Sequence, residues 1–416
     1  MSQLTDQNAA IRSMPMAGPA NSSAAYYSRR QKIFVLVTLL ISWILANADR
    51  MAMSVSIIPI TKEFALDAQA AGMVLGSFYI SYALMQLVAG WLADRFGSRR
   101  VLVFCVACWS VFTSLTGVAG SLFALIAIRL LFGLGEGGFA PASTVTIAEA
   151  FPKPERARAK SLIIGASFLG SAVGTGAIAA LIHIYGWRAA YHAFGLVGVV
   201  VAAVLWFAVK ESPMRQHGTR PQGLFRTLFG KMVLKKTMLI FFCSNIVYIG
   251  LISWMPTFLV KTRDIDIVHV GAASAIPYVA AFLALNIVGW LLDKVGRGRE
   301  RLFMATGAAM VIVFLGLMAV ATSLPWLLAF WTLSLVGYTA IYGTVFAIPL
   351  KHLPDESVGT ASGIINFGGQ VAAGIAPVVI GMLVTAGKGS FTWAFGFLIA
   401  AGAGALAIAL TWKPDQ

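Results

Sequence analysis

The chain has 416 residues, of which 59% are hydrophobic and 11% charged, and its formal net charge is +15. A soluble domain carries roughly 25% charged residues, so this composition excludes an ordinary water-soluble protein. The basic residues stand in short segments between long apolar runs. That pattern is typical of membrane topology and argues against nucleic acid as a partner. Three cysteines are too few, and odd in number, for a disulfide framework.

Twelve apolar runs of spanning length follow a polar tail, residues 1–28, that is rich in small residues. We expect the tail to be disordered, and it has no sign of a cleaved signal peptide. The predicted spans are 33–58, 70–91, 101–119, 122–148, 159–181, 189–209, 238–260, 270–292, 302–320, 326–350, 358–385 and 391–412. The sequence therefore predicts an all-α membrane protein with twelve transmembrane helices surrounded by the lipid bilayer.

Lys and Arg are distributed unequally between the two sides of this arrangement. The segments on the side of the tail hold 24 of the 31 Lys and Arg residues, whereas the opposite loops hold five. Basic residues favour the cytoplasmic side, so both termini are predicted to be cytoplasmic. Two termini on the same side require an even number of spans, which agrees with the twelve predicted. We expect a multi-pass protein of a cell inner membrane that works as a monomer.

The widest polar gap, residues 210–237, divides the chain nearly in half and is strongly basic. We interpret it as a cytoplasmic linker that lies along anionic lipid headgroups. It would join an N-terminal six-helix bundle, residues 29–209, to a C-terminal six-helix bundle, residues 238–416.

A short pattern recurs at the same place in both halves. The segment GWLADRFGSRR starts at Gly90, and GWLLDKVGR starts at Gly289. Such a repeat indicates internal duplication. Glycine permits close helix approach and a tight turn, and an Asp at a helix end can accept hydrogen bonds from a neighbouring helix N-terminus. The residues that carry these features are Gly90, Asp94, Arg95, Gly97 and Arg99 in the first copy and Gly289, Asp293 and Gly296 in the second.

This repeated loop resembles the signature loop of the major facilitator superfamily, and the resemblance implies that its residues in both copies form a conformational latch. Three further segments resemble its anion:cation symporter family, namely NADR ending at Arg50, RLLFGLGEG starting at Arg129, and GWR starting at Gly186. That family includes bacterial sugar-acid, tartrate and aromatic-acid permeases and animal sialin. The resemblance implies two pseudo-symmetric bundles, alternating access with a latch that breaks and re-forms, and import of a small organic anion by proton symport. Ser167 and Phe346 stand where sugar-acid members often carry Gln and Trp.

The interiors of the predicted spans hold four ionisable residues: Asp49, Arg50, Arg129 and Glu136. Each costs roughly 2.5–3.5 kcal/mol inside a bilayer unless it is paired or faces water. Arg129 and Glu136 are two helical turns apart and share a face, whereas Asp49 and Arg50 project about 100° apart. Their charges sum to zero when both carboxylates are ionised, so a bound anion would require proton uptake. We expect Asp49, Glu136 and Arg129 to couple protons, with the proton as the only coupling ion and no other cofactor.

The second half offers uncharged polar side chains instead of charges. Asn366 and Gln370 are four residues apart and share a face, as do Tyr82 and Gln86 in the first half. We assign the selection of the organic anion to these hydrogen-bonding groups together with the two arginines. The residues expected to bind substrate are Arg50, Arg129, Tyr82, Gln86, Asn366, Gln370 and Tyr342.

Three other interpretations remain open. The four charges could form a static ion-pair network, and any one Tyr or Asn could serve helix packing. A proton-antiport exporter of drugs or metabolites is the alternative function, although the fifth span lacks the Gly-Pro pair usual in such exporters. A membrane-embedded enzyme is disfavoured, because the sequence has no metal-ligand spacing and no nucleophile–base pair.

The charge asymmetry predicts that a reporter fused after Gln416 stays on the cytoplasmic side. The measurement is a paired fusion with alkaline phosphatase, active outside the cytoplasm, and green fluorescent protein, fluorescent inside it. We expect fluorescence and no phosphatase activity. The opposite pattern would contradict the predicted orientation.

Overall fold

The computed structural model describes residues 27–210, 228–295, 298–353 and 355–413. Twelve further residues are described only by their helical backbone: Leu87, Gly90, Trp91, Asp94, Lys153, Pro154, Ala157, Arg158, Ser161, Val295, Asp355 and Glu356. Nearly all of the predicted tail 1–28, most of the predicted linker 210–237 and the latch residue Gly296 therefore lie outside the described residues.

The described residues form long helices and no strands. The helices are α2 (Arg29–Glu63), α3 (Ala68–Phe96), α4 (Ser98–Thr116), α5 (Leu122–Gly137), α6 (Phe139–Ala150), α7 (Lys153–Ala208), α9 (Met232–Arg263), α10 (Ile267–Val295), α11 (Glu300–Val320), α12 (Leu324–His352), α13 (Asp355–Ala386) and α14 (Thr392–Leu410). In the described part of the chain, eleven stretches are long and apolar enough to cross a membrane. The all-α membrane prediction is confirmed.

One of these stretches supplies two crossings. Helix α7 has 56 residues, and at Gly186 its backbone has φ 81°, a value that glycine adopts without strain. The chain turns there, so the predicted fifth and sixth spans are the two arms of α7. This turn replaces the seven-residue loop expected between 181 and 189, and it brings the count of crossings in the described residues to twelve.

The predicted fourth span, 122–148, is interrupted at Gly138, between α5 and α6. Pro141 follows three residues later and has no N–H to donate to the carbonyl of Gly137. The missing hydrogen bond explains the interruption. Helix α6 therefore continues the same crossing after a small break.

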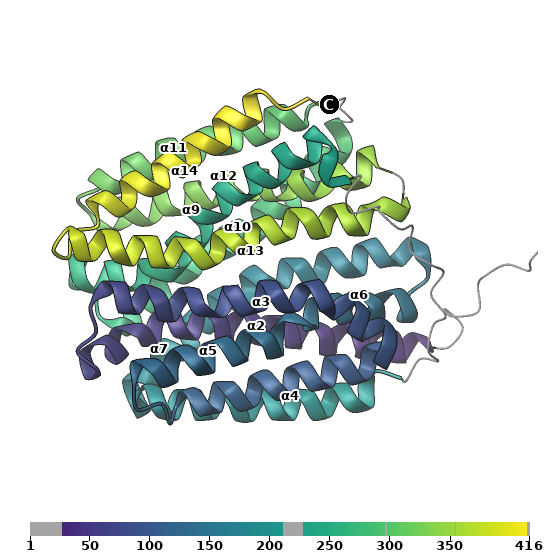
Figure 1. Cartoon of the computed structure of the whole chain (residues 1–416), viewed down its shortest axis with the longest axis horizontal. Helices are drawn as coiled ribbons and strands as arrows, with labels where there is room; N and C mark the ends of the chain where they lie inside the picture. The colour runs from purple at the N-terminus through teal and green to yellow at the C-terminus, as the bar shows by residue number, and fades with distance from the viewer. Residues whose placement is uncertain (1–26, 211–227, 296–297, 354, 414–416) are drawn as a thin grey trace, which may run out of the picture.

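The helices form two groups that meet along a common interface. Figure 1 shows α2 to α7 on one side of the bundle and α9 to α14 on the other, with α3 beside α13 where the groups meet. Helix α7 packs against α10, and α2 packs against α9, in the same interface. This arrangement places the charged residues of α2 and α5 within reach of the polar helices of the second group.

The α3–α13 contact is tightest at the end of the bundle away from the start of α2. A Cβ atom at Gly72 would lie 2.5 Å from the carbonyl oxygen of Pro377. The backbone amide of Gln69 donates to Thr385 Oγ1 at 3.0 Å. We call this region, formed by Gln69, Gly72, Pro377 and Thr385, the closed end.

Alanine substitutions at two helical glycines test how much the closed end contributes to stability. At Gly72 the added methyl meets backbone, which should destabilise the fold by about 1–3 kcal/mol. At Gly289 nothing lies within 4 Å, so Gly289→Ala should be neutral or slightly stabilising, because Ala is a better helix former. The measurement is thermal unfolding in detergent micelles. Equal thermal unfolding midpoints for the two variants would show that α3 and α13 can move apart to accommodate the added methyl group at little cost in stability.

Candidate functional site

Asp49 and Arg50, the two ionisable residues in the interior of α2, point to two different neighbouring helices. Asp49 is 2% exposed, and its Oδ2 accepts a hydrogen bond from Thr113 Oγ1 of α4 at 2.5 Å. Arg50, the next residue, reaches α5, where Nε donates to Glu136 Oε1 at 2.8 Å and Nη2 donates to the same oxygen at 2.5 Å. The 100° rotation between consecutive helical residues separates the two side chains. Asp49 and Arg50 therefore each have their own partner on another helix.

The Arg50–Glu136 pair is the buried ion pair of the first half. The side chain of Glu136 is 1% exposed, whereas that of Arg50 is 17% exposed. Arg50 also lies over the ring of Tyr82, with 4.8 Å from Cζ to the centroid. The arginine is therefore held between a carboxylate and an aromatic face, and part of its surface remains accessible.

Arg129 is differently placed although it shares a helix with Glu136. It is 3% exposed, and among the described residues it has no hydrogen bond and no ion pair. Its Cζ lies 5.2 Å from the ring centroid of Phe78 and 4.9 Å from that of Phe132. Phe78 is also 5.4 Å from Cζ of Arg50. One buried ring thus contacts both cations, and Arg129 is a buried cation that packs on aromatic faces, within electrostatic interaction range of Asp49 and Glu136 but without an ion pair to either.

Three polar atoms of this cluster are buried without a hydrogen-bond partner: Asp49 Oδ1, Glu136 Oε2 and Arg129 Nε. Buried polar atoms are normally satisfied, so atoms left over in one place mark a site that takes up protons, water or a ligand. The two carboxylate oxygens can accept protons. The guanidinium can bind an anion. The cluster combines both capacities within one set of helices.

The structure joins two of the predicted substrate residues to each other. Asn366 Nδ2 of α13 donates to Gln86 Oε1 of α3 at 2.5 Å, a hydrogen bond between the two groups of helices. Gln370, one turn further along α13, is half-buried and has no hydrogen bond within the described part of the chain. Tyr342 of α12 lies within electrostatic interaction range of both Tyr82 and Arg50. Two of the predicted substrate residues, Tyr82 from the first group and Tyr342 from the second, therefore lie near Arg50.

Sequence reasoning missed the partners of the predicted residues. Thr113 and Phe78 carry no signal in the sequence, because a Thr or Phe inside an apolar helix is ordinary and the partner lies on another helix. The buried acid Glu300 was also missed. Its carboxylate accepts from the amide of Gly298 at 2.8 Å and contacts His352 Nε2 at 3.1 Å. This pair ties the start of α11 to the end of α12, far from the Arg50 cluster along the chain.

The latch residues are described only in part. Gly97 joins α3 to α4 with φ 85°, which requires glycine, and Arg99 lies over the ring of Trp206 at 4.1 Å. Arg95 and Asp293 are exposed. Gly90 and Asp94 are described only by their helical backbone.

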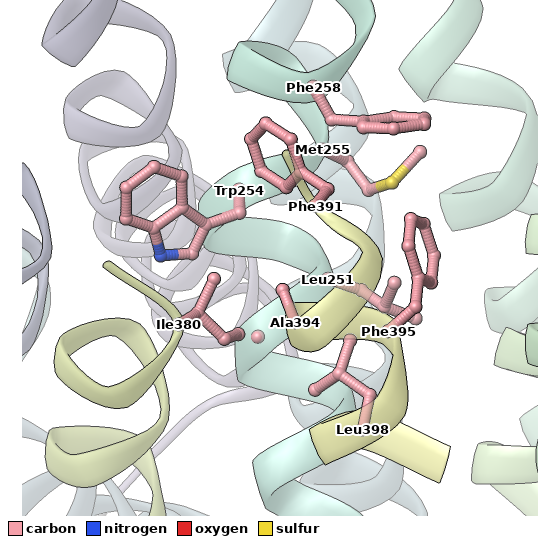
Figure 2. Close-up of a pocket in the computed structure, with 10 residues that line it drawn as sticks. Leu251, Trp254, Met255, Phe258, Ile380, Phe391, Ala394, Phe395 and Leu398 are labelled. Carbon is pink, nitrogen blue, oxygen red and sulfur yellow. The ribbon is translucent and has the colours of Figure 1, made fainter. Parts of the chain in front are cut away.

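An apolar pocket lies apart from the charged cluster, between α9, α13 and α14 (Figure 2). Trp254, Phe258, Phe391 and Phe395 line it, and its other lining residues are also uncharged and apolar or glycine. The indole N–H of Trp254 donates to the carbonyl of Pro377 and does not serve the pocket. A carboxylate would lose its hydration there without compensation, so this pocket is not the anion site. In the described ranges, no group of three or more His, Cys, Asp or Glu residues could hold a metal ion.

Comparison with known proteins identifies the family of this chain. A family profile described as Major Facilitator Superfamily matches residues 38–377. The chain is 28% identical over 375 residues to a probable sulfoacetate transporter of Cupriavidus necator, covering 84% of this chain and 86% of that protein. It is 27% identical over 425 residues to a probable galactarate/D-glucarate transporter of Escherichia coli, covering 92% of each.

A solved structure shares the fold. A bacterial homolog of the human lysosomal transporter Spinster, in an inward-facing and unoccupied conformation, superposes with a TM-score of 0.80 at 20% identity, covering 94% of this chain and 99% of that one. The profile match extends over most of the chain, and the related proteins are named as transporters of small anions. This chain belongs to the Major Facilitator Superfamily, and it is a membrane transporter rather than an enzyme.

Proposed function

We propose that the protein imports a small organic anion together with protons, by alternating access across a cell inner membrane. Arg129 and Arg50 bind the carboxylate of the substrate, and Asp49 and Glu136 carry the protons. Candidate substrates are a sugar acid, a dicarboxylate or an aromatic carboxylate. The anionic cargo named for the related proteins, sulfoacetate in one and galactarate or D-glucarate in another, supports an anionic substrate here.

The observation that carries this proposal is the unpaired guanidinium of Arg129. A cation inside the bilayer costs roughly 2.5–3.5 kcal/mol unless something compensates it. The rings of Phe78 and Phe132 offset part of that cost, since cation–π contacts contribute about 0.5–2 kcal/mol. Asp49 and Glu136 lie within electrostatic interaction range but form no ion pair with Arg129, so an anionic ligand in direct contact would add the missing pair. The guanidinium of Arg129 therefore serves to bind the substrate anion reversibly.

The ion pair of Arg50 supplies a way to couple that ligand to protons. While Glu136 is ionised, it occupies Nε and Nη2 of Arg50. A proton on Glu136 would remove the charge that holds Arg50, and Arg50 would become a second anion-binding group. Asp49, with one oxygen buried and unpartnered, supplies a second protonation site. Each proton raises the charge of the cluster by one, so substrate binding follows proton uptake.

The closed end gives the direction of access. It lies opposite the basic loops, so with cytoplasmic termini it faces outward, and its tight α3–α13 contact supports an inward-facing state. Opening it requires α3 to separate from α13. The repeated loops with Asp94 and Asp293 would close the cytoplasmic end in exchange. Such a rocking of one bundle against the other agrees with transport by a monomer.

The proposal predicts that binding and proton coupling can be separated by substitution. Glu136→Gln and Asp49→Asn imitate the protonated carboxyl, so both variants should bind substrate and exchange labelled for unlabelled substrate. Both should fail to accumulate it under a proton gradient, because the substituted group releases no proton. Arg129→Ala should lose both activities, since removal of a charge-assisted contact in a desolvated site typically costs about 2–5 kcal/mol. The measurement is exchange and pH-driven uptake in proteoliposomes.

Arg129→Lys is the matched control, because it keeps the positive charge and should retain partial binding. Wild-type accumulation by both carboxylate variants would show that the four charges are a static network. Undiminished uptake by Arg129→Ala would remove the assigned anion site.

Thr113→Val tests the charge state of Asp49. Valine keeps the shape of threonine and removes the hydroxyl that donates to Asp49, whereas Thr113→Ser keeps that donor. Hydrogen bonds to charged groups contribute about 1.5–3 kcal/mol, so we expect Thr113→Val to lose about that much unfolding free energy in mixed micelles and Thr113→Ser clearly less. A loss near 0.6 kcal/mol, the average for hydrogen bonds inside membranes, would instead indicate that Asp49 is neutral in this state.

A further inference from the structure

Aromatic rings surround the proposed anion site on its first-half side. Phe78 and Tyr82 contact the guanidinium of Arg50, and Phe78 also contacts Arg129. Tyr79 lies within electrostatic interaction range of Arg50. A ligand carboxylate that reaches either arginine therefore arrives beside ring faces of α3.

The second half presents a matching set of rings. Tyr248 of α9 and Tyr338 of α12 are stacked, with centroids 4.4 Å apart and planes 4° from parallel. Tyr342 and Phe346 continue the row along α12, with centroids 5.1 Å apart. Tyr338 is buried, whereas Tyr248, Tyr342 and Phe346 are only partly buried. Ring surface thus remains available along this row.

Two tyrosines of this row lie near the charged cluster. Tyr248 and Tyr342 both lie within electrostatic interaction range of Arg50 across the interface between the two groups of helices. Phe168 of α7 contacts Tyr248, with centroids 6.1 Å apart. Rings of both groups therefore lie around one region, next to the cations.

Three amide side chains of this region are already engaged with protein atoms, whereas Gln370 of α13 has no hydrogen bond within the described residues. Gln86 and Asn366 bond to each other. Asn245 donates to the carbonyl of Gly369 at 2.6 Å and accepts from the hydroxyl of Tyr338 at 3.1 Å. A substrate with many hydroxyl groups would have to satisfy them with the capacity these amides have left, with Gln370 and with the tyrosine hydroxyls. A planar apolar ring would leave the existing bonds intact.

We infer that the substrate of this transporter is an aromatic carboxylate rather than a polyhydroxylated acid. The carboxylate pairs with Arg129, and with Arg50 once Glu136 releases it, while the ring of the ligand packs on Tyr248, Tyr342 and Phe346. Offset or edge-to-face packing between aromatic rings contributes beyond the burial of area, which favours an aromatic ring over a saturated ring of the same size. The inference rests on the proposed function and names the substrate class of the same site.

The test compares ligands that differ in one property each. Benzoate and cyclohexanecarboxylate have the same carboxylate and nearly the same size, and gluconate has the carboxylate with a hydroxylated chain. We expect the purified full-length protein to bind benzoate about threefold to tenfold more tightly than cyclohexanecarboxylate by isothermal titration, and gluconate most weakly. Equal affinities for the two ring acids, or tighter binding of gluconate, would overturn the inference.

Two variants connect this preference to the named rings. Tyr248→Leu should abolish the difference between benzoate and cyclohexanecarboxylate while retaining binding of both. Phe314→Leu is the matched control, because Phe314 is also half-buried and stacks on a ring, Phe330, at 6.4 Å, but in the α11–α12 contact. It should keep the preference. Loss of the preference in Phe314→Leu but not in Tyr248→Leu would contradict the assignment.

Arg129→Ala separates this inference from the proposed function. If gluconate binds best and Arg129→Ala abolishes that binding, the anion site stands and the aromatic preference is wrong. If no carboxylate of the panel depends on Arg129 for binding, the proposed function fails and the inference fails with it.

Discussion

The ion pair between Arg50 and Glu136 is the interaction on which the rest of the site depends. It joins α2 to α5 inside the membrane, where an isolated charge is costly, and it fixes where each remaining charge goes. With Glu136 occupied by Arg50, Arg129 forms no ion pair within the described part of the chain, although Asp49 and Glu136 lie within electrostatic interaction range. With Arg50 turned toward α5, Asp49 is left to the hydroxyl of Thr113. The cluster is balanced in total charge but unevenly paired, and that unevenness leaves one cation for a ligand.

Close helix packing makes this geometry possible. At Gly133, between Arg129 and Glu136 on α5, an added Cβ would collide with the carbonyl of Phe78 and with Ser81 Oγ on α3. Because Gly133 has no side chain, α5 and α3 can approach closely, and Phe78 of α3 then contacts the guanidinium groups of Arg50 and Arg129. The same device closes the α3–α13 interface at Gly72. Small residues thus set both the position of the charges and the closure of one end.

The two halves of the molecule contribute different chemistry. The first half supplies the cations and the acids, and the second half supplies aromatic faces and amides that are already hydrogen-bonded. On the proposed function, a ligand between them would be oriented, with its charge toward α2 and α5 and its body toward α9 and α12. Movement of one half relative to the other would change the contacts at both ends of the ligand together, which couples its binding to the conformational state.

The sequence by itself determined the membrane class, the twelve crossings, the family resemblance and the four ionisable residues, because hydrophobic length, glycine patterns and rare intramembrane charges are local signals. It could separate Asp49 from Arg50 by their 100° rotation but not name their partners. Only the tertiary structure decided that Glu136 binds Arg50, that Arg129 stays unpaired, that Phe78 contacts both cations, and that Gln86 bonds Asn366. These pairs are separated by up to 280 positions in the chain and depend on which helices become neighbours, a property of packing that no local pattern records.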